Sequence, residues 1–186
     1  SFALNRWSGK KCYMFGARAL DIAWGNTPQY WTWRSRRESR FPEIAVLREV
    51  RWLLIEVTIK PTILTRNTTY GAYFVYKVIV GEQHGFEYTP VKTSVYEFKE
   101  EDGSEDPHLD AMPFNFFYLK ALRFAFPREV LPNARGDSWM EIEMGRYYVN
   151  DYIDERSWLK MRLQEIEKLH TKTGLAVEGI ELRPLD

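Results

Sequence analysis

Residues 51–60, RWLLIEVTIK, limit the possible folds of this chain more than any other segment. Their apolar side chains recur at every second position, so one face of an extended strand carries Leu53, Ile55, Val57 and Ile59. Pro61 follows at once and ends the strand, because proline has no N–H to donate to a neighbouring strand. The segment therefore predicts a β-strand with one buried face.

Further segments have the same character. Residues 69–80 are rich in Tyr, Phe and Val, which favours a strand. Alternation or apolar steps predict more strands at residues 11–22, 30–34, 91–98 and around 140–144. Residues 35–50 are charged and contain Pro42, so we expect a loop there with a helical turn at 44–47.

Two segments are ambiguous. FNFFYLKALRFAFPRE, residues 114–129, fits either a strand or a short helix. Residues 158–167 fit both periods as well, and we favour a strand because the neighbouring segments are strands. Between residues 175 and 182 the apolar parity changes near Gly179, which predicts a β-bulge at that glycine.

Many short strands without an alternating helix pattern predict an all-β fold, an antiparallel β-sandwich with long loops. The 186 residues are near the usual size of one domain, so we expect a single domain over 1–186. KEEDGSEDPHLDAMP, near residues 99–113, reads as an acidic insertion in that domain.

Composition argues against several partners and compartments. Lys plus Arg and Asp plus Glu both number 26, whereas a nucleic-acid-binding protein usually has a basic excess, so no nucleic acid is expected. No apolar run approaches the roughly 20 residues of a membrane span, and no signal peptide is recognised, so no membrane is expected. One cysteine, Cys12, permits no internal disulfide and suits a reducing compartment.

The usual enzyme motifs do not occur in the sequence. Nucleophile-elbow, Walker, Rossmann and zinc-protease patterns are all missing. The three histidines lie far apart, Cys12 reads as an inert buried thiol, and 26 acidic residues make chance carboxylate pairs common. We therefore expect no catalytic residue, no metal site and no cofactor.

WGNTPQYWTW, residues 24–33, places three tryptophans around a Gly-Asn-Thr-Pro turn. Strand parity points Trp31 and Trp33 the same way, with Tyr30 opposite and Trp24 just before the turn. The indoles could fill the core. The alternative is an exposed wall that stacks on the apolar face of sugar rings, with Asn26 binding hydroxyl or acetamido groups.

At this point the sequence resembles a known family. ARALDIAWGNTPQYWTW is similar to the opening of the plant phloem protein 2 lectins, also called the Nictaba domain. The segments VRWLLIEVTIKPTILTRNTTYGAYFVYKV, HGFEYTPVKTSV, RGDSWMEIEMG and GLAVEGIELRP are similar to later family segments in the same order. The start, SFALNRWSGKKCYMFGARAL, resembles the PP2-B branch, in which the lectin domain follows an F-box.

The resemblance implies a jelly-roll-like sandwich and a non-catalytic plant lectin of the cytoplasm and nucleus. Such lectins bind N-acetylglucosamine oligomers, chitin fragments and N-glycan cores. The family's binding tryptophans fall on Trp24 and Trp31, with the adjoining aromatic residue at Trp33. An acidic ligand-binding residue falls on Glu165, whereas a second acidic position of the family is Trp158 in this chain.

Three hypotheses follow for the function. The first is a lectin for glycans or glycoproteins that contain N-acetylglucosamine, bound by Trp24, Asn26, Trp31, Trp33 and Glu165. The second is the substrate-recognition domain of an F-box ubiquitin ligase receptor, joined to SCF components through an upstream F-box that lies outside these residues. The third is a structural phloem protein whose aromatic residues are core. We also expect a homodimer, since a shallow single site gains avidity from pairing.

Overall fold

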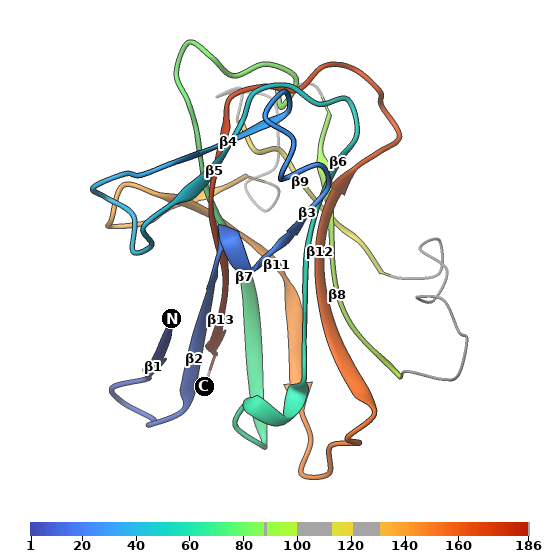
Figure 1. Cartoon of the computed structure of the whole chain (residues 1–186). Coiled ribbons are helices and arrows are strands. Elements are labelled where there is room, and N and C mark those ends of the chain that lie inside the picture. The colour runs from blue at the N-terminus through green and yellow to red at the C-terminus, as the bar shows by residue number, and fades with distance from the viewer. Residues whose placement is uncertain (88, 100–112, 121–130, 186) are drawn as a thin grey trace.

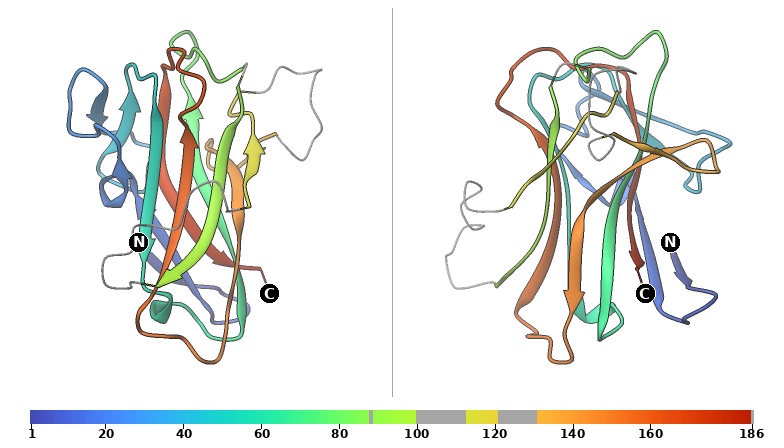
Figure 2. Two further views of the ribbon diagram at one scale, coloured as in Figure 1. Left: turned by 90° about the vertical axis from the view of Figure 1, so that its right-hand side faces the viewer. Right: turned by 180° about the vertical axis from the view of Figure 1, so that it is seen from behind.

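A computed structural model describes residues 1–87, 89–99, 113–120 and 131–185. In this part of the chain, strands make up nearly all of the regular structure, and they form two antiparallel sheets that pack face to face (Figures 1 and 2). The predicted antiparallel β-sandwich is therefore confirmed. The acidic insertion predicted near 99–113 lies almost wholly outside the described residues.

The larger sheet runs in the order β1, β2, β13, β7, β11, β10, and β5 pairs with both β13 and β4. Its strands are β1 (Phe2–Leu4), β2 (Lys11–Gly16), β4 (Trp31–Arg34), β5 (Ile44–Leu47), β7 (Thr68–Val78), β10 (Asn133–Ala134), β11 (Met140–Val149) and β13 (Leu175–Pro184). The smaller sheet runs in the order β3 (Asp21–Ile22), β6 (Leu53–Ile59), β12 (Ser157–Glu165), β8 (Val91–Lys99) and β9 (Asn115–Phe117).

Most connections between successive strands cross from one sheet to the other. It passes from β2 to β3, from β6 to β7, from β7 to β8, and from β11 through β12 to β13. Two 3-10 turns, η1 (Ala17–Ala19) and η2 (Pro61–Ile63), accompany the first two of these crossings. This repeated crossing of antiparallel strands is the jelly-roll-like connectivity that the resemblance implies.

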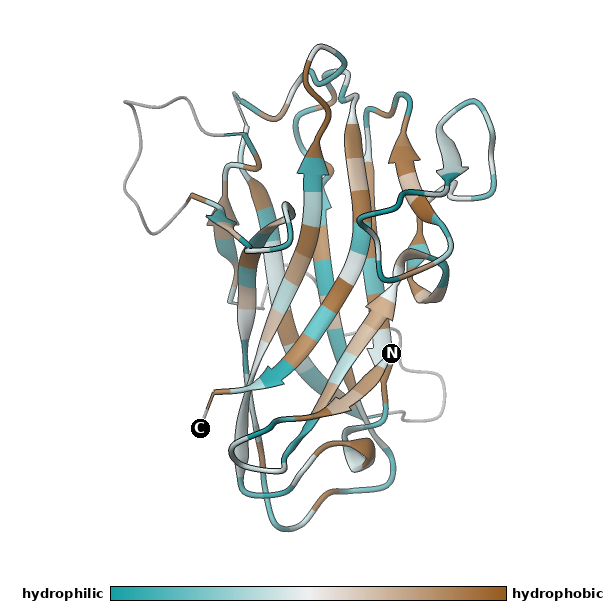
Figure 3. Ribbon diagram, turned by 90° about the vertical axis from the view of Figure 1, so that its left-hand side faces the viewer, coloured by the Kyte–Doolittle hydropathy of each residue, from teal (hydrophilic) through white to brown (hydrophobic). Residues whose placement is uncertain are grey.

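The core lies between the sheets and follows the two-residue period. Apolar and polar residues alternate along the strands, which gives the banded colouring of Figure 3. The apolar face of β6 packs against buried residues of both sheets, among them Phe74, Ile142, Leu163 and Leu182. Each large apolar side chain buried in this way stabilises the fold by about 1.5–3 kcal/mol.

Two strand predictions need correction. Residues 44–47, expected as a helical turn, form β5, and all four side chains are buried because β5 pairs with β4 and β13. The strand predicted over 11–22 is interrupted: β2 ends at Gly16, η1 turns the chain, and β3 joins the other sheet. Tertiary pairing therefore outweighs the charged flanks and the continuous apolar pattern at these positions.

Two other predictions are confirmed. Residues 157–165 form a strand rather than a helix. The pairing of β13 with β7 shifts register between Val177 and Gly179, which is the bulge that the change of apolar parity predicted.

Three loops meet at one end of the sandwich, at the top of Figure 1. They follow β3, β5 and β12. Backbone hydrogen bonds join them: Arg48 N–H donates to the Tyr30 carbonyl at 2.8 Å, and Val50 and Lys172 exchange bonds of 3.0 and 2.8 Å. This fixed loop cluster contains two of the five residues predicted for the site, Trp24 and Asn26. Trp31 and Trp33 follow in β4, and Glu165 is the last residue of β12.

Candidate functional site

Trp24 occupies the turn after β3 in an unusual backbone conformation. Its φ angle is +57°, in the left-handed region that bulky residues rarely adopt. Backbone bonds from Gly25 N to the Ile22 carbonyl and from Thr27 N to the Trp24 carbonyl, both 2.8 Å, close the turn on each side. The Trp24 side chain is 47% exposed, so the turn presents this indole to solvent.

Trp31 and Trp33 hold that turn in place. The Trp31 indole N–H donates to the Ala23 carbonyl at 3.2 Å, and the Trp33 indole N–H donates to the Gly25 carbonyl at 2.9 Å. The two bonds fasten the residues directly before and after Trp24. The parity prediction for these two residues is confirmed, but their common face points toward the core, where Trp31 is only 2% exposed.

The expectation that Trp31 offers an open indole face is therefore wrong, because the sandwich buries it. Trp33 is half-buried, and the Arg18 guanidinium lies 3.7 Å from the centre of its ring. The wall of indoles expected from Trp24, Trp31 and Trp33 does not form. Trp31 and Trp33 support the turn, and Trp24 is the residue of the three that the turn displays.

Other aromatic residues surround Trp24 instead. Trp52 meets it edge to face with ring centres 5.4 Å apart, and Tyr30 lies 5.7 Å away at a tilt. With Glu49, Val50 and Arg51 these rings line an open hollow of about 330 Å³. Its size is at the lower end of small-ligand sites, and its walls are mostly apolar with a few polar groups, as in such sites. We call it the Trp24 hollow.

Glu165 lies beneath the loop cluster rather than in the Trp24 hollow. Its carboxylate forms an ion pair of 2.5 Å with Lys172, and its other oxygen accepts from Lys168 N at 2.8 Å. The Lys172 ammonium also donates to the carbonyls of Arg51, Lys168 and His170 at 2.8–3.1 Å. Both side chains are almost fully buried, so the pair ties the loop after β12 to the loop before β6.

Asn26 lies on the far side of the turn. It shares a small hollow of 140 Å³ with Trp33, Arg18 and Asp21, and none of these four lines the Trp24 hollow. The structure therefore separates the predicted site residues. Trp24 lies in one hollow, Asn26 and Trp33 lie in another, and Trp31 and Glu165 are buried supports.

The sequence contained a signal for the two rings that the prediction missed. Trp52 shares strand parity with Leu54 and Glu56, opposite to the buried Leu53 and Ile55, so its position indicated the solvent side. Tyr30 likewise has the parity opposite to Trp31. The resemblance drew attention to the tryptophans of the first loop, and neither residue was included in the site.

Other chemistries have little support in the described part of the chain. No group of three or more His, Cys, Asp and Glu residues there has a geometry that could hold a metal ion. No helix among the described residues is long and apolar enough to cross a membrane. Glu49 is the one carboxylate among the described residues that line the Trp24 hollow.

Comparisons with known proteins agree on one family. The family model described as Phloem protein 2 matches residues 10–184. Two similar proteins of Arabidopsis thaliana are named F-box protein PP2-B10 and Putative F-box protein PP2-B12. Each is 35% identical to the chain, over 97% and 99% of its length, and the chain covers 63% and 65% of theirs. The chain thus spans a little under two thirds of these relatives.

Solved structures show a weaker likeness. The family 35 carbohydrate binding module from Clostridium thermocellum has a TM-score of 0.45 and 11% identity, over 92% of this chain and 96% of that one. The CBM22-1 xylan-binding domain of Xyn10C from Paenibacillus barcinonensis has a TM-score of 0.37 and 12% identity, over 94% and 86%.

Proposed function

Because the chain belongs to the phloem protein 2 family, we propose that it is a carbohydrate-binding domain for N-acetylglucosamine oligomers or the N-glycan core. The observation that carries the proposal is the Trp24 hollow. An indole held in a left-handed turn, beside two more aromatic rings, offers a rigid apolar surface to solvent. Flat rings of this kind match the C–H face of a pyranose at little entropic cost.

Polar groups at the rim complete the proposed site. Glu49 and Arg51 line the Trp24 hollow beside the rings. A carboxylate accepts hydrogen bonds from hydroxyl or acetamido N–H groups, and a guanidinium donates to acetamido carbonyls. These two residues take the hydrogen-bonding role expected of Asn26 and Glu165, which lie outside the hollow.

The volume of the hollow limits the length of the ligand. The Trp24 hollow has a volume of about 330 Å³, at the lower end of small-ligand sites, so a short oligomer fills it. We therefore expect the N-acetylglucosamine dimer to bind more tightly than the monomer, and longer oligomers to gain little once the hollow is filled. A shallow open site of this kind binds in the micromolar to millimolar range.

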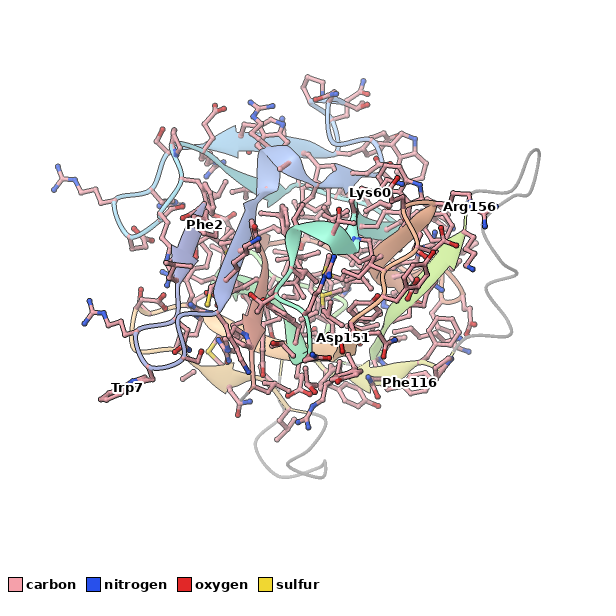
Figure 4. All side chains as sticks on the ribbon, turned by 90° about the horizontal axis from the view of Figure 1, so that it is seen from below. Phe2, Trp7, Lys60, Phe116, Asp151 and Arg156 are labelled. Carbon is pink, nitrogen blue, oxygen red and sulfur yellow. The ribbon has the colours of Figure 1, made fainter. Side chains whose placement is uncertain are left out.

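Isothermal titration calorimetry with the N-acetylglucosamine trimer tests the proposal. Trp24→Ala and Trp52→Ala each remove a stacking face and should raise the Kd about tenfold or more. A tenfold change corresponds to about 1.4 kcal/mol of binding free energy. Trp7→Ala is the matched control, because Trp7 is 97% exposed at the periphery of the molecule (Figure 4). It lies in the loop between β1 and β2, at the opposite end of the sandwich from the loop cluster (Figure 1). Equal binding by all three variants would reject the Trp24 hollow as the site.

We further propose that the domain binds without cleaving its ligand. Most glycosidases use a pair of carboxylic acids, whereas one carboxylate lines the Trp24 hollow among the described residues. The trimer should therefore stay intact after prolonged incubation with the protein, as judged by mass spectrometry. Release of the monomer or dimer would contradict this part of the proposal.

A second candidate function follows from the names of the relatives, which are F-box proteins of which this chain covers a little under two thirds. We propose that the domain recognises substrates for an F-box ubiquitin ligase receptor of the cytoplasm and nucleus. The two functions agree if the glycan marks the substrate. A glycoprotein with an N-glycan core should then bind before but not after enzymatic deglycosylation. Retained binding after deglycosylation would favour protein recognition alone.

A further inference from the structure

The loop between β4 and β5, residues 35–43, contains the segment SRRESR and is here called the arginine loop. Arg36 and Arg37 in it are exposed. They lie three and two residues before Ser39, and no other serine or threonine of the sequence has arginine at both of these positions. Serine kinases select substrates by such charge patterns, and one large class requires arginines at these two positions. The loop therefore carries the recognition sequence of an arginine-directed serine kinase.

The arginine loop folds back onto the outer face of the larger sheet. The Trp139 indole N–H donates to the Glu38 carbonyl at 3.1 Å, and the Lys77 ammonium pairs with the Glu38 carboxylate at 3.2 Å. The Phe41 ring packs against a buried apolar cluster that includes Trp139 and Met14. In Figure 1 the loop lies at the left, beside the loop between β10 and β11. These contacts hold the loop on the sheet.

The Ser39 hydroxyl takes part in this attachment. It donates to Oε1 of Glu178 at 3.2 Å and accepts from the Phe41 N–H at 3.0 Å. The Arg40 N–H donates to the same Glu178 oxygen at 2.8 Å. Glu178 lies in the bulge of β13 and is only 1% exposed. One buried carboxylate thus binds two adjacent residues of the arginine loop.

No cation neutralises Glu178 in the described part of the chain. The Arg40 guanidinium is the nearest in sequence to these contacts, and it lies 3.6 Å from the carboxylates of Asp137 and Glu181 instead. The carboxylate of Glu178 is therefore held by hydrogen-bond donors of the loop alone. A second negative charge beside it would meet no counter-ion.

Phosphorylation would change this contact in two ways. A phosphate ester has no hydroxyl hydrogen, so Ser39 could no longer donate to Glu178. The phosphate also brings about −1.5 to −2 charges to a position next to a buried carboxylate, where like-charge repulsion is disruptive. We propose that Ser39 is a phosphorylation site for an arginine-directed serine kinase, and that the phosphate releases the arginine loop from the sheet.

The reaction uses Mg²⁺–ATP as the second substrate. The bond between the γ-phosphorus and the oxygen that bridges to the β-phosphate breaks, and a new bond forms between this phosphorus and Ser39 Oγ. ADP leaves with the bridging oxygen, and the hydroxyl proton passes to the catalytic carboxylate of the kinase. Because the Ser39 side chain is half-buried, the transfer takes place when the loop opens locally.

Incubation of the whole chain with Mg²⁺–ATP and the catalytic subunit of cyclic-AMP-dependent protein kinase, an arginine-directed enzyme, tests the site. Mass spectrometry should find a phosphate on Ser39, and Ser39→Ala should lack it. Arg37→Ala should lower kcat/KM about tenfold or more, because a charged contact with the kinase is lost. Ser35→Ala is the matched control, an exposed serine of the same loop without the arginine pair, and should react like wild type. An unmodified Ser39, or an unchanged rate in Arg37→Ala, would overturn the assignment.

Hydrogen exchange of the tryptophan indole groups tests the release of the loop. The Trp139 indole N–H is buried against the Glu38 carbonyl, so its exchange should quicken about tenfold or more in the phosphorylated chain. The Trp31 indole N–H is bound to Ala23 in the core and should keep its rate. An unchanged rate at Trp139 would refute the release, and equal acceleration at Trp31 would show unfolding of the whole domain instead.

Glu178→Gln tests the cause of the release. The amide that it introduces can accept from the Arg40 N–H and donate to the phosphate, and it carries no charge. Phosphorylated Glu178→Gln should therefore keep the slow exchange of Trp139, whereas fast exchange in this variant would contradict repulsion by the carboxylate. The wild-type comparison stands alone if Glu178→Gln does not fold.

The phosphorylation site does not depend on carbohydrate binding. Ser39, Glu178 and Trp139 are absent from the described linings of the Trp24 hollow and of the hollow around Asn26. None of the three experiments uses a sugar. Failure of the carbohydrate proposal would therefore leave this inference intact, and the reverse also holds.

Discussion

Lys172→Met tests the interpretation of Glu165 as a buried support. In the native fold the Lys172 ammonium meets one carboxylate and three carbonyl oxygens, and its side chain is 1% exposed. Methionine fills a similar volume but removes all four interactions and leaves Glu165 buried without its counter-ion. Breaking a buried ion pair from one side costs about 3–5 kcal/mol. For a domain of this size that cost lowers Tm by about 6–20 °C.

Glu165→Gln should cost less than Lys172→Met. It removes one charge but leaves the ammonium with the carbonyls of Arg51, Lys168 and His170, so we expect about 1–3 kcal/mol. Urea unfolding measures both variants. Lys168→Met is the control, because that side chain is exposed, and it should change stability by less than about 0.5 kcal/mol. A loss in Lys172→Met no larger than in Lys168→Met would refute the reasoning.

Three further perturbations have defined outcomes. Trp31→Phe removes the hydrogen bond from the indole N–H to the Ala23 carbonyl, so it should lower the free energy of unfolding by about 1–3 kcal/mol and also weaken trimer binding. Urea unfolding and calorimetry measure the two effects. Unchanged binding would contradict the role of Trp31 as a support of the turn. Gly179→Ala would place a methyl carbon 2.0 Å from the Phe15 carbonyl oxygen at the bulge, so it should destabilise the fold by about 3 kcal/mol or more. A Tm equal to that of the wild type would exclude this close approach. The Arg156 backbone N–H, followed by the side chains of Lys99 and Arg156, holds the pKa of the Asp154 carboxyl well below its usual range. A carboxyl whose folded pKa is lowered stabilises the fold above its unfolded pKa and loses that effect as the pH falls through the folded pKa. Asp154→Asn should therefore be less stable than wild type at pH 7. The difference in the free energy of unfolding between the two proteins should shrink below about pH 4. Urea unfolding at several pH values checks this, and a constant difference would disagree with it.

Much of the fold could be predicted from the residues alone. The two-residue period predicted the buried face of β6, and the change of parity near Gly179 located the bulge, because both follow from local strand geometry. The strand β5 could not be predicted, since its four apolar residues sit in a charged segment and become a strand only by pairing with β13 and β4. The pairing with β13 joins residues more than a hundred positions apart.

The site was predicted less well for a related reason. Parity states which side chains share a face but not which face is inside, and Trp31 and Trp33 proved to share the inner one. The aromatic partners of Trp24 come from the loops around Tyr30 and Trp52, and the second of these is distant in sequence. Only the packing of the three loops brings these rings together, while Asn26 is directed to the opposite side of the turn.

The most direct test of the proposed carbohydrate site follows the indole N–H signals of the ¹⁵N-labelled protein during titration with the N-acetylglucosamine trimer. Seven tryptophans give seven signals, each assigned by a single substitution. The signals of Trp24 and Trp52 should shift together and saturate, while that of the exposed Trp7 stays in place. Saturation of binding with the Trp24 and Trp52 signals unmoved would contradict the account.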